Sequence, residues 1–246
     1  MTSDAVEAVR ADRAALLEIC GTLTAEDWRA ESGCPGWSVQ DLIAHLGTLF
    51  WSVVDRTQVP DTSGLPTERA QDACVASRRD WDAARVLADY EEVSTVALER
   101  LADLAALDME VPLGDLGTYP ASVLPCAFSF DHYTHIRADL FGPRGPLPGP
   151  PPPSDELRIG PTLDWIEAAL PQQNAAAAAA SRFELRILGT GARTIRFGSG
   201  PANATITSDA PSLVLWVTQR GNWAELGVRA VGDEAALPVA SQLKVF

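Results

Sequence analysis

The sequence predicts a multidomain protein in which an all-α N-terminal four-helix bundle is followed by a smaller α+β domain. Three observations indicate this fold class: a proline-rich segment near the middle of the chain, helical spacing of apolar residues before it, and short alternating segments after it. Proline is excluded from helix interiors and central strands and favours an extended spacer. We therefore expect the bundle over residues 1–142, a linker over residues 143–154 and the α+β domain over residues 155–246.

The first helices of the bundle follow from capping signals and apolar spacing. One helix is expected from residue 3 or 4 to residue 20. A second should begin at Ser38, because Ser38 and Asp41 have the spacing of a capping box and apolar residues then recur at helical intervals up to residue 53. Trp37, just before this helix, is expected to be a core residue because of its large ring.

The remaining elements are expected from composition and breaker residues. Residues 67–107 lack proline and glycine and predict two helices or one long bent helix, and a final bundle helix should lie within residues 121–141, ending before Gly142 and Pro143. Residues 175–180 are either a helical extension or a connector. The second half should contain helices at residues 157–170, 212–220 and 233–243 and strands at residues 183–188, 193–197 and 204–207.

The composition excludes some classes of partner. With 46% hydrophobic and 21% charged residues in 246, the chain resembles an average soluble globular protein. Its net charge of −14 would repel nucleic acid and anionic lipid, so we expect neither nucleic acid nor a membrane as partner. Residues 1–4 lack the positive charge and following apolar core of a secretory signal, so we expect none, and no apolar run approaches roughly 20 residues. The four cysteines form no CxxC pair, which favours reduced thiols in the cytoplasm.

Candidate metal ligands are concentrated in the bundle. All three histidines, His45, His132 and His135, lie there, and Asp131 precedes His135 by four residues, so that both project from one helix face. Carboxylate and imidazole groups from different helices are a common way to build a metal site in a bundle. Three protein ligands would leave a coordination position open for catalysis, and zinc accepts both nitrogen and oxygen donors.

Other interpretations of these residues stay open. His132 could replace Asp131 as the third ligand, because it also lies within one helical turn of the last histidine. Asp131 could instead pair with Arg137, and His45 could be an ordinary buried histidine. Two cysteines are further candidate ligands, although cysteine is often a small buried hydrophobe: Cys34 and Cys126.

Two parts of the chain resemble a known family. Residues 33–46, GCPGWSVQDLIAHL, are similar to the signature of the mycothiol-dependent maleylpyruvate isomerase family. Near the C-terminus, TSDA at 207–210, LVLWV at 213–217, Arg220, VGD at 231–233 and the final VF are similar to the second domain of that family. The resemblance implies a DinB-like metal-binding bundle followed by a sterol-carrier-like α+β domain; it is weak over residues 60–118.

The resemblance also implies cofactors and residue roles. A divalent ion, usually zinc, would be bound by His45, Asp131 and His135. The family's acid is typically glutamate, so the shorter Asp131 departs from the pattern and puts the geometry or occupancy of the site in question. Mycothiol, a low-molecular-weight thiol, would be bound between the domains and activated as its thiolate by the metal. Arg220 would be a catalytic and cofactor-binding residue that holds an anionic group, unless it only caps its helix.

Taken together, these features favour a metal-dependent and mycothiol-dependent transferase or isomerase that acts on a small electrophilic molecule. One alternative is a non-catalytic protein that binds a small molecule or lipid on the same fold. Another is a metal-dependent hydrolase that uses a metal-bound water. The chain would act as a monomer or a homodimer, and its substrate does not follow from fold-level similarity.

Overall fold

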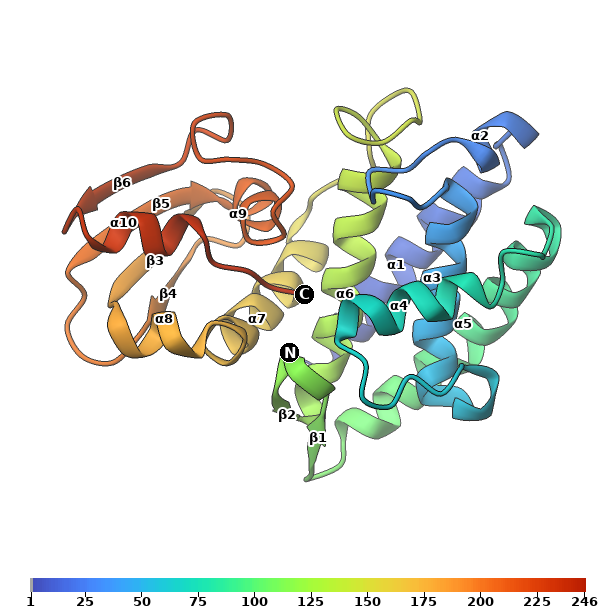
Figure 1. The fold of residues 1–246 in the computed structure, drawn as a ribbon, viewed down its shortest axis with the longest axis horizontal. Coiled ribbons are helices and arrows are strands. Elements are labelled where there is room, and N and C mark those ends of the chain that lie inside the picture. Colours follow the sequence, from blue (N-terminus) through green and yellow to red (C-terminus); the bar gives the residue numbers. More distant parts are fainter. Residues whose placement is uncertain (1) are drawn as a thin grey trace.

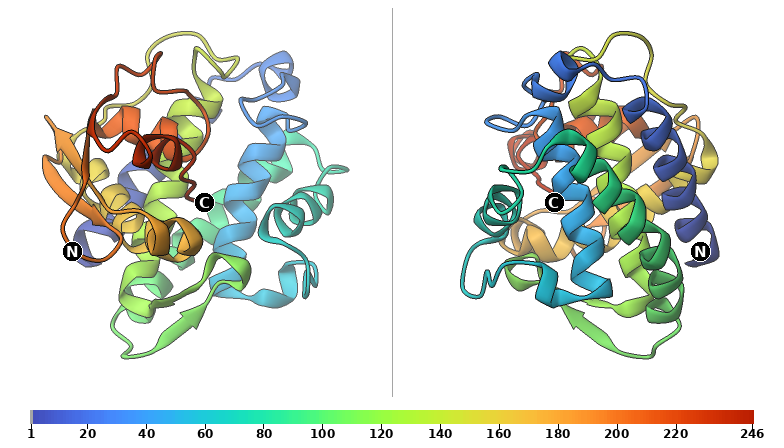
Figure 2. Two further views of the ribbon diagram at one scale, coloured as in Figure 1. Left: turned by 60° about the vertical axis from the view of Figure 1, so that its left-hand side comes forward. Right: turned by 90° about the vertical axis from the view of Figure 1, so that its right-hand side faces the viewer.

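The N-terminal half of the protein is a helical bundle, as the sequence predicts. The computed structural model describes residues 2–246, and its bundle contains four long helices that pack side by side (Figures 1 and 2). They are α1 (Thr2–Cys20), α3 (Val39–Val54), α5 (Ala83–Ala105) and α6 (Leu124–Thr134). The shorter helices α2 (Ala25–Arg29) and α4 (Thr67–Ala76) flank them.

Helix α3 begins where the capping signal predicts. The Ser38 hydroxyl accepts a hydrogen bond from the Asp41 amide (3.1 Å), and the Asp41 carboxylate accepts one from the Ser38 amide (3.0 Å). This reciprocal pair satisfies two amides that the first turn of a helix leaves without a partner. Thr24 and Asp27 form the same motif before α2, a helix that the sequence analysis did not predict.

Residues 67–107 form two helices, which settles one of the open alternatives. Helix α5 starts after Asp82, whose carboxylate accepts a hydrogen bond from the Arg85 amide (2.8 Å). A small antiparallel hairpin, β1 (Glu110–Pro112) and β2 (Thr118–Pro120), follows it and was not predicted. Short 3-10 turns complete this half: η1 (Arg56–Gln58), η2 (Gly114–Leu116) and η3 (Ala121–Val123).

The last bundle helix changes its hydrogen-bonding pattern partway along. The α-helical part, α6, ends at Thr134, and the chain continues as a π-helical segment, η4 (His135–Leu140). The predicted single helix over residues 121–141 is therefore a 3-10 turn, an α-helix and a π-helix in succession. Segments of π-helix are rare and often accompany functional sites.

The C-terminal half is an α+β unit with one buried sheet face. The sheet has the order β4-β3-β5-β6, in which β3 pairs antiparallel with β4 and parallel with β5. Apolar side chains alternate with exposed ones along β3, so one face carries the core. The elements are α7 (Glu156–Gln173), α8 (Ala175–Ala180), β3 (Phe183–Leu188), β4 (Arg193–Phe197), β5 (Ala204–Asp209), α9 (Ala210–Val217), β6 (Arg229–Gly232) and α10 (Ala236–Ser241). Of these, β6 was not predicted.

The core of the C-terminal half extends into the bundle. One apolar cluster fills the bundle, while a second runs from the sheet through α7 to Phe130 and Tyr133 on α6. Helix α7 accordingly lies between the two halves, against α1 and α6 on one side and β4 on the other (Figure 1). Within residues 2–246, no helix is long and apolar enough to cross a membrane.

Candidate metal centre between the bundle helices

The structure brings the three predicted ligands together. His45 Nε2 lies 3.5 Å from one carboxylate oxygen of Asp131, and His135 Nε2 lies 3.4 Å from the other. The two imidazole rings have centroids 5.0 Å apart and are nearly perpendicular. His45 comes from α3, whereas Asp131 and His135 come from one face of α6 and its continuation, as their spacing of four residues predicts.

Trp37 forms part of the surroundings of His45. Its ring centroid lies 5.1 Å from that of His45, and its indole nitrogen donates a hydrogen bond to Asp72 on α4 (3.1 Å). The side chain is half-buried rather than fully buried. Trp37 therefore lines the candidate centre. The sequence predicts a core position for it at the start of α3, and that prediction is wrong.

The donor atoms of the cluster fit a divalent cation. Neither ring nitrogen of His45, nor the Asp131 oxygen facing it, has a hydrogen-bond partner among the described residues, although all three atoms are buried. Buried polar atoms are rarely left in this state, because each loses its hydration without compensation. Tetrahedral zinc with bonds of about 2.0–2.2 Å requires donors roughly 3.3 Å apart. The separations of 3.4 and 3.5 Å, each to a different Asp131 oxygen, are close to this value, and one donor atom from each of the three residues lies within 4.8 Å of the other two.

The electrostatics of the cluster favour a charged carboxylate. Burial would raise the pKa of Asp131, but the adjacent His135 and His45 outweigh burial and hold that pKa well below its usual value. Burial would lower the pKa of His135, but Asp131 and Asp139 outweigh it and hold that pKa well above its usual value. A cation at the three donor atoms would therefore compete with a proton on His135.

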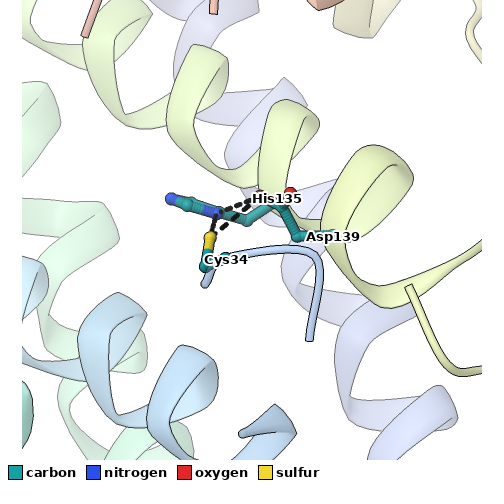
Figure 3. A group of neighbouring side chains, drawn as sticks. All are labelled: Cys34, His135 and Asp139. Atoms are coloured by element: carbon teal, nitrogen blue, oxygen red, sulfur yellow. Dashed lines mark hydrogen bonds and ion pairs between the residues drawn. The ribbon is translucent and has the colours of Figure 1, made fainter. Parts of the chain in front are cut away.

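Asp139 is a site residue that the sequence analysis missed. It is completely buried, and its carboxylate accepts a hydrogen bond from His135 Nδ1 (2.8 Å). Figure 3 shows this ring nitrogen facing Asp139 and Cys34, with the other ring nitrogen turned away from them. The spacing from His135 to Asp139 repeats the spacing of four from Asp131 to His135. That repeat was the available signal, but it does not by itself reveal a buried carboxylate.

Cys34 lies on the Asp139 side of the His135 ring. Its thiol donates a hydrogen bond to Asp139 (3.2 Å), and its sulfur lies 3.6 Å from His135 Nδ1. Cys34, His135 and Asp139 thus form a second group of potential metal ligands. Arg220 argues against an ion there, because its guanidinium already neutralises Asp139 and would repel a cation. Cys126 lies elsewhere, in the core shared with the sheet, and burial raises the pKa of its thiol to about 12.

His132, the alternative ligand, points into the bundle core. Its Nδ1 donates a hydrogen bond to the carbonyl of Phe128 (2.9 Å), so its Nε2 accepts one from the Tyr90 hydroxyl (3.1 Å). Burial lowers the pKa of His132, which keeps the ring neutral in this arrangement. Because both ring nitrogens are engaged, we keep Asp131 in the candidate ligand set and leave His132 out.

Arg220 joins the candidate centre from the C-terminal half. It follows α9, and its Nε lies 2.9 and 3.1 Å from the two carboxylate oxygens of Asp139, while Nη2 lies 2.5 Å from one of them. Burial would lower the pKa of Arg220, but Asp139 outweighs it and raises that pKa. Asp139 therefore occupies the Nε and Nη2 edge of the guanidinium. Among residues 2–246, Nη1 donates to the carbonyl of Thr218 alone (3.3 Å).

Comparisons with known proteins agree with the resemblance in the sequence. Residues 9–129 match the family model described as the mycothiol maleylpyruvate isomerase N-terminal domain. A crystal structure of the mycothiol-dependent maleylpyruvate isomerase aligns over 95% of this chain and 94% of its own, with a TM-score of 0.60 and 18% identity. A histidine-to-alanine mutant of that isomerase gives a TM-score of 0.55 and 14% identity over the same shares. No curated protein matches the chain by sequence.

Proposed function

Because the helical half of this chain belongs to the mycothiol maleylpyruvate isomerase N-terminal domain family, we propose that the protein is a mycothiol-dependent isomerase or S-transferase with a divalent cation, zinc, at His45, Asp131 and His135. The observation that carries this proposal is the set of buried donor atoms without partners on His45 and Asp131. Buried donor and acceptor atoms are usually satisfied by hydrogen bonds, so three such atoms on two adjacent side chains support a bound cation.

In this proposal the three side chains act as an open ligand set. His45 and His135 offer ring nitrogens, that of His135 once the cation has displaced its proton, and Asp131 offers a carboxylate that its surroundings keep ionised. When bound, the cation supplies the chemistry that holds a thiol sulfur as its thiolate, the nucleophile that adds reversibly to an electrophilic carbon. The aspartate in place of the family's usual glutamate is compatible with this role, because both of its oxygens lie within 3.5 Å of an imidazole nitrogen.

Arg220 is proposed to orient the reactants. Asp139 holds the Nε and Nη2 side of its guanidinium and the Thr218 carbonyl accepts from Nη1, which leaves one Nη1 hydrogen for an anionic group of the thiol or the substrate. The proposed substrate is a small electrophilic molecule that carries a carboxylate. In this role Arg220 holds the ligand in place and does not transfer a proton, because a guanidinium stays protonated.

The proposal is tested by metal content and thiol dependence together. Wild-type protein incubated with zinc and desalted should retain about one ion per chain by elemental analysis. It should isomerise maleylpyruvate, the substrate in the names of the similar structures, only when mycothiol is present. The His45→Ala variant should lose both the ion and the activity, because it removes the only ligand from α3. A matched control, His132→Gln, alters a buried histidine that we leave out of the ligand set and should retain the ion.

Specific results would contradict the proposal. If the wild-type protein takes up no zinc, the proposed metal centre is rejected. Turnover of a substrate without any thiol would instead favour a hydrolase that uses a metal-bound water. Retention of zinc without thiol-dependent turnover of maleylpyruvate would leave the metal centre in place and reject that substrate.

A further inference from the structure

Asp139 contacts three residues that the candidate centre brings together. Its side chain is fully buried on the π-helical segment η4, where it accepts hydrogen bonds from His135, Arg220 and Cys34. Those three partners come from the last bundle helix, the C-terminal half and the loop before α3. One carboxylate therefore joins a proposed metal ligand, whose contact with Asp139 is drawn in Figure 3, to the proposed ligand-orienting arginine.

The position of Asp139 is fixed by its backbone as well as by its side chain. The Gly33 amide donates a hydrogen bond to the Asp139 carbonyl (2.7 Å). A Cβ atom on Gly33 would lie 2.7 Å from both Cα and Oδ1 of Asp139, so only glycine permits this approach. With the loop and the helix held this closely, the carboxylate has little freedom to turn away from His135.

The contact with Asp139 determines which nitrogen of His135 is free. A carboxylate accepts but does not donate, so the bond of 2.8 Å places a proton on Nδ1. In the neutral ring, the lone pair is then on Nε2, the nitrogen that faces Asp131. Among the described residues, His45 has no comparable partner on either nitrogen. The two imidazoles are thus unequal, and only His135 is oriented by a neighbouring carboxylate.

The same carboxylate links the two halves of the protein. Asp139 and Arg220 are 81 residues apart, and their ion pair joins η4 to the chain after α9. Because Arg220 holds both oxygens of Asp139, its position affects the oxygen that His135 contacts. The arrangement of the C-terminal half can therefore influence the orientation of a ligand in the bundle.

We propose that Asp139 is a positioning residue that orients His135 for metal binding and makes this orientation depend on Arg220. The proposal rests on the proposed function, because it assumes a cation at Nε2 of His135. It extends that function by making the metal centre sensitive to how the C-terminal half is docked. Carboxylates that accept from the outer nitrogen of a metal-binding histidine typically raise metal affinity about 10- to 100-fold.

The first test measures zinc affinity by competition with a chelating dye, using the full-length chain. Asp139→Asn should weaken zinc binding about 10- to 100-fold. Asp12→Asn is a matched control: Asp12 is equally buried and ion-paired with Arg137 and Arg158, but it contacts no proposed ligand. It should lower the melting temperature and leave zinc affinity unchanged. If both variants lose stability and neither loses zinc affinity, Asp139 has only a structural role and the proposal is overturned.

The second test examines the dependence on Arg220. Arg220→Gln should change the zinc dissociation constant of the wild type by at least about twofold, and should have no such effect in the Asp139→Asn background. Equal effects in both backgrounds, or no effect in the wild type, would refute the dependence.

A third measurement needs no zinc, so it separates this proposal from the proposed function. Imidazole ¹⁵N spectra of the zinc-free protein, at a pH where His135 is neutral, should show its proton on Nδ1 in the wild type. The form with the proton on Nε2 should appear in Asp139→Asn. Wild-type His135 with its proton on Nε2 would overturn the positioning role even if zinc binds. If the wild type gives the expected spectra but binds no zinc, that result rejects the metal centre and, with it, the function assigned to Asp139. Only the hydrogen bond between Asp139 and His135 would then be established.

Discussion

At the scale of single residues, the candidate centre is set by which polar atoms have partners and which do not. His132 and His135 are both buried. Both ring nitrogens of His132 form hydrogen bonds, one with Phe128 and one with Tyr90. His135 instead directs one ring nitrogen to Asp139, and its other nitrogen faces Asp131. Burial alone thus does not distinguish a structural histidine from a ligand. The number of ring nitrogens already engaged does.

The four cysteines should differ in reactivity for a similar local reason. Burial raises the pKa of the Cys20 and Cys126 thiols to about 12 and also raises that of Cys74, so their thiolate fractions at pH 8 are very small. Cys34 is only half-buried. Because the thiolate is the reacting species, iodoacetamide should modify Cys34 first in the native protein, as peptide mass spectrometry can show. Labelling of all four thiols at one rate in the native protein would contradict this prediction. The unfolded protein, in which all four thiols are exposed, provides the reference for equal labelling rates.

At the scale of elements, the start of α3 and the end of α6 bring the ligands to the same place. The capping box at Ser38 fixes the first turn of α3, and His45 lies about two turns further along the same helix. On the facing helix, the change from α to π geometry begins at His135 itself and places Asp139 in contact with that residue's ring. The two proposed histidine ligands thus lie at defined points on two facing helices, with ring centroids 5.0 Å apart.

Loss of the α3 cap should destabilise the fold measurably. Ser38→Ala removes the acceptor for the Asp41 amide and should lower the free energy of unfolding by about 1 kcal/mol, as determined by urea denaturation. Ser52→Ala is the control within the same helix, since the Ser52 hydroxyl donates a hydrogen bond back to the Leu49 carbonyl one turn earlier (2.6 Å) and caps no helix end. We expect a change of less than about 0.5 kcal/mol there. Equal losses in both variants would show that the cap does not stabilise α3.

At the scale of the whole molecule, the two halves share apolar and charged contacts. The core of the sheet continues through α7 to α6, and Asp12 on α1 pairs with Arg158 on α7 (2.7 Å) and Arg137 on η4 (2.9 Å). The Asp139–Arg220 pair adds a second connection. The proline-rich segment separates the halves along the sequence, but the packing of α7 joins them in space.

This shared core should make unfolding a single transition. Calorimetry should give equal calorimetric and van't Hoff enthalpies. Leu163→Ala, a fully buried position on α7, should lower the free energy of unfolding by about 2–5 kcal/mol while leaving one transition. Two resolved transitions, with only one of them shifted by Leu163→Ala, would mean that the halves unfold independently.

The sequence by itself determined the helical bundle and the main strands of the α+β half, and it predicted the candidate ligands with His132 left as an alternative to Asp131. These features depend on local signals: the capping spacing at Ser38, apolar periodicity, and the separation of Asp131 and His135 by four residues. Strand β6 and the β1–β2 hairpin escaped prediction because their residues are few and mostly exposed, so they lack a strong apolar pattern.

Only the tertiary structure decided how the ligands are used. It brought His45 beside His135 from a helix distant in sequence, engaged His132 elsewhere, and paired Asp139 with Arg220 across 81 residues. The physical reason is that a hydrogen bond or an ion pair depends on distance and direction in space. Sequence spacing fixes these quantities only within an element, whereas between elements they are set by packing.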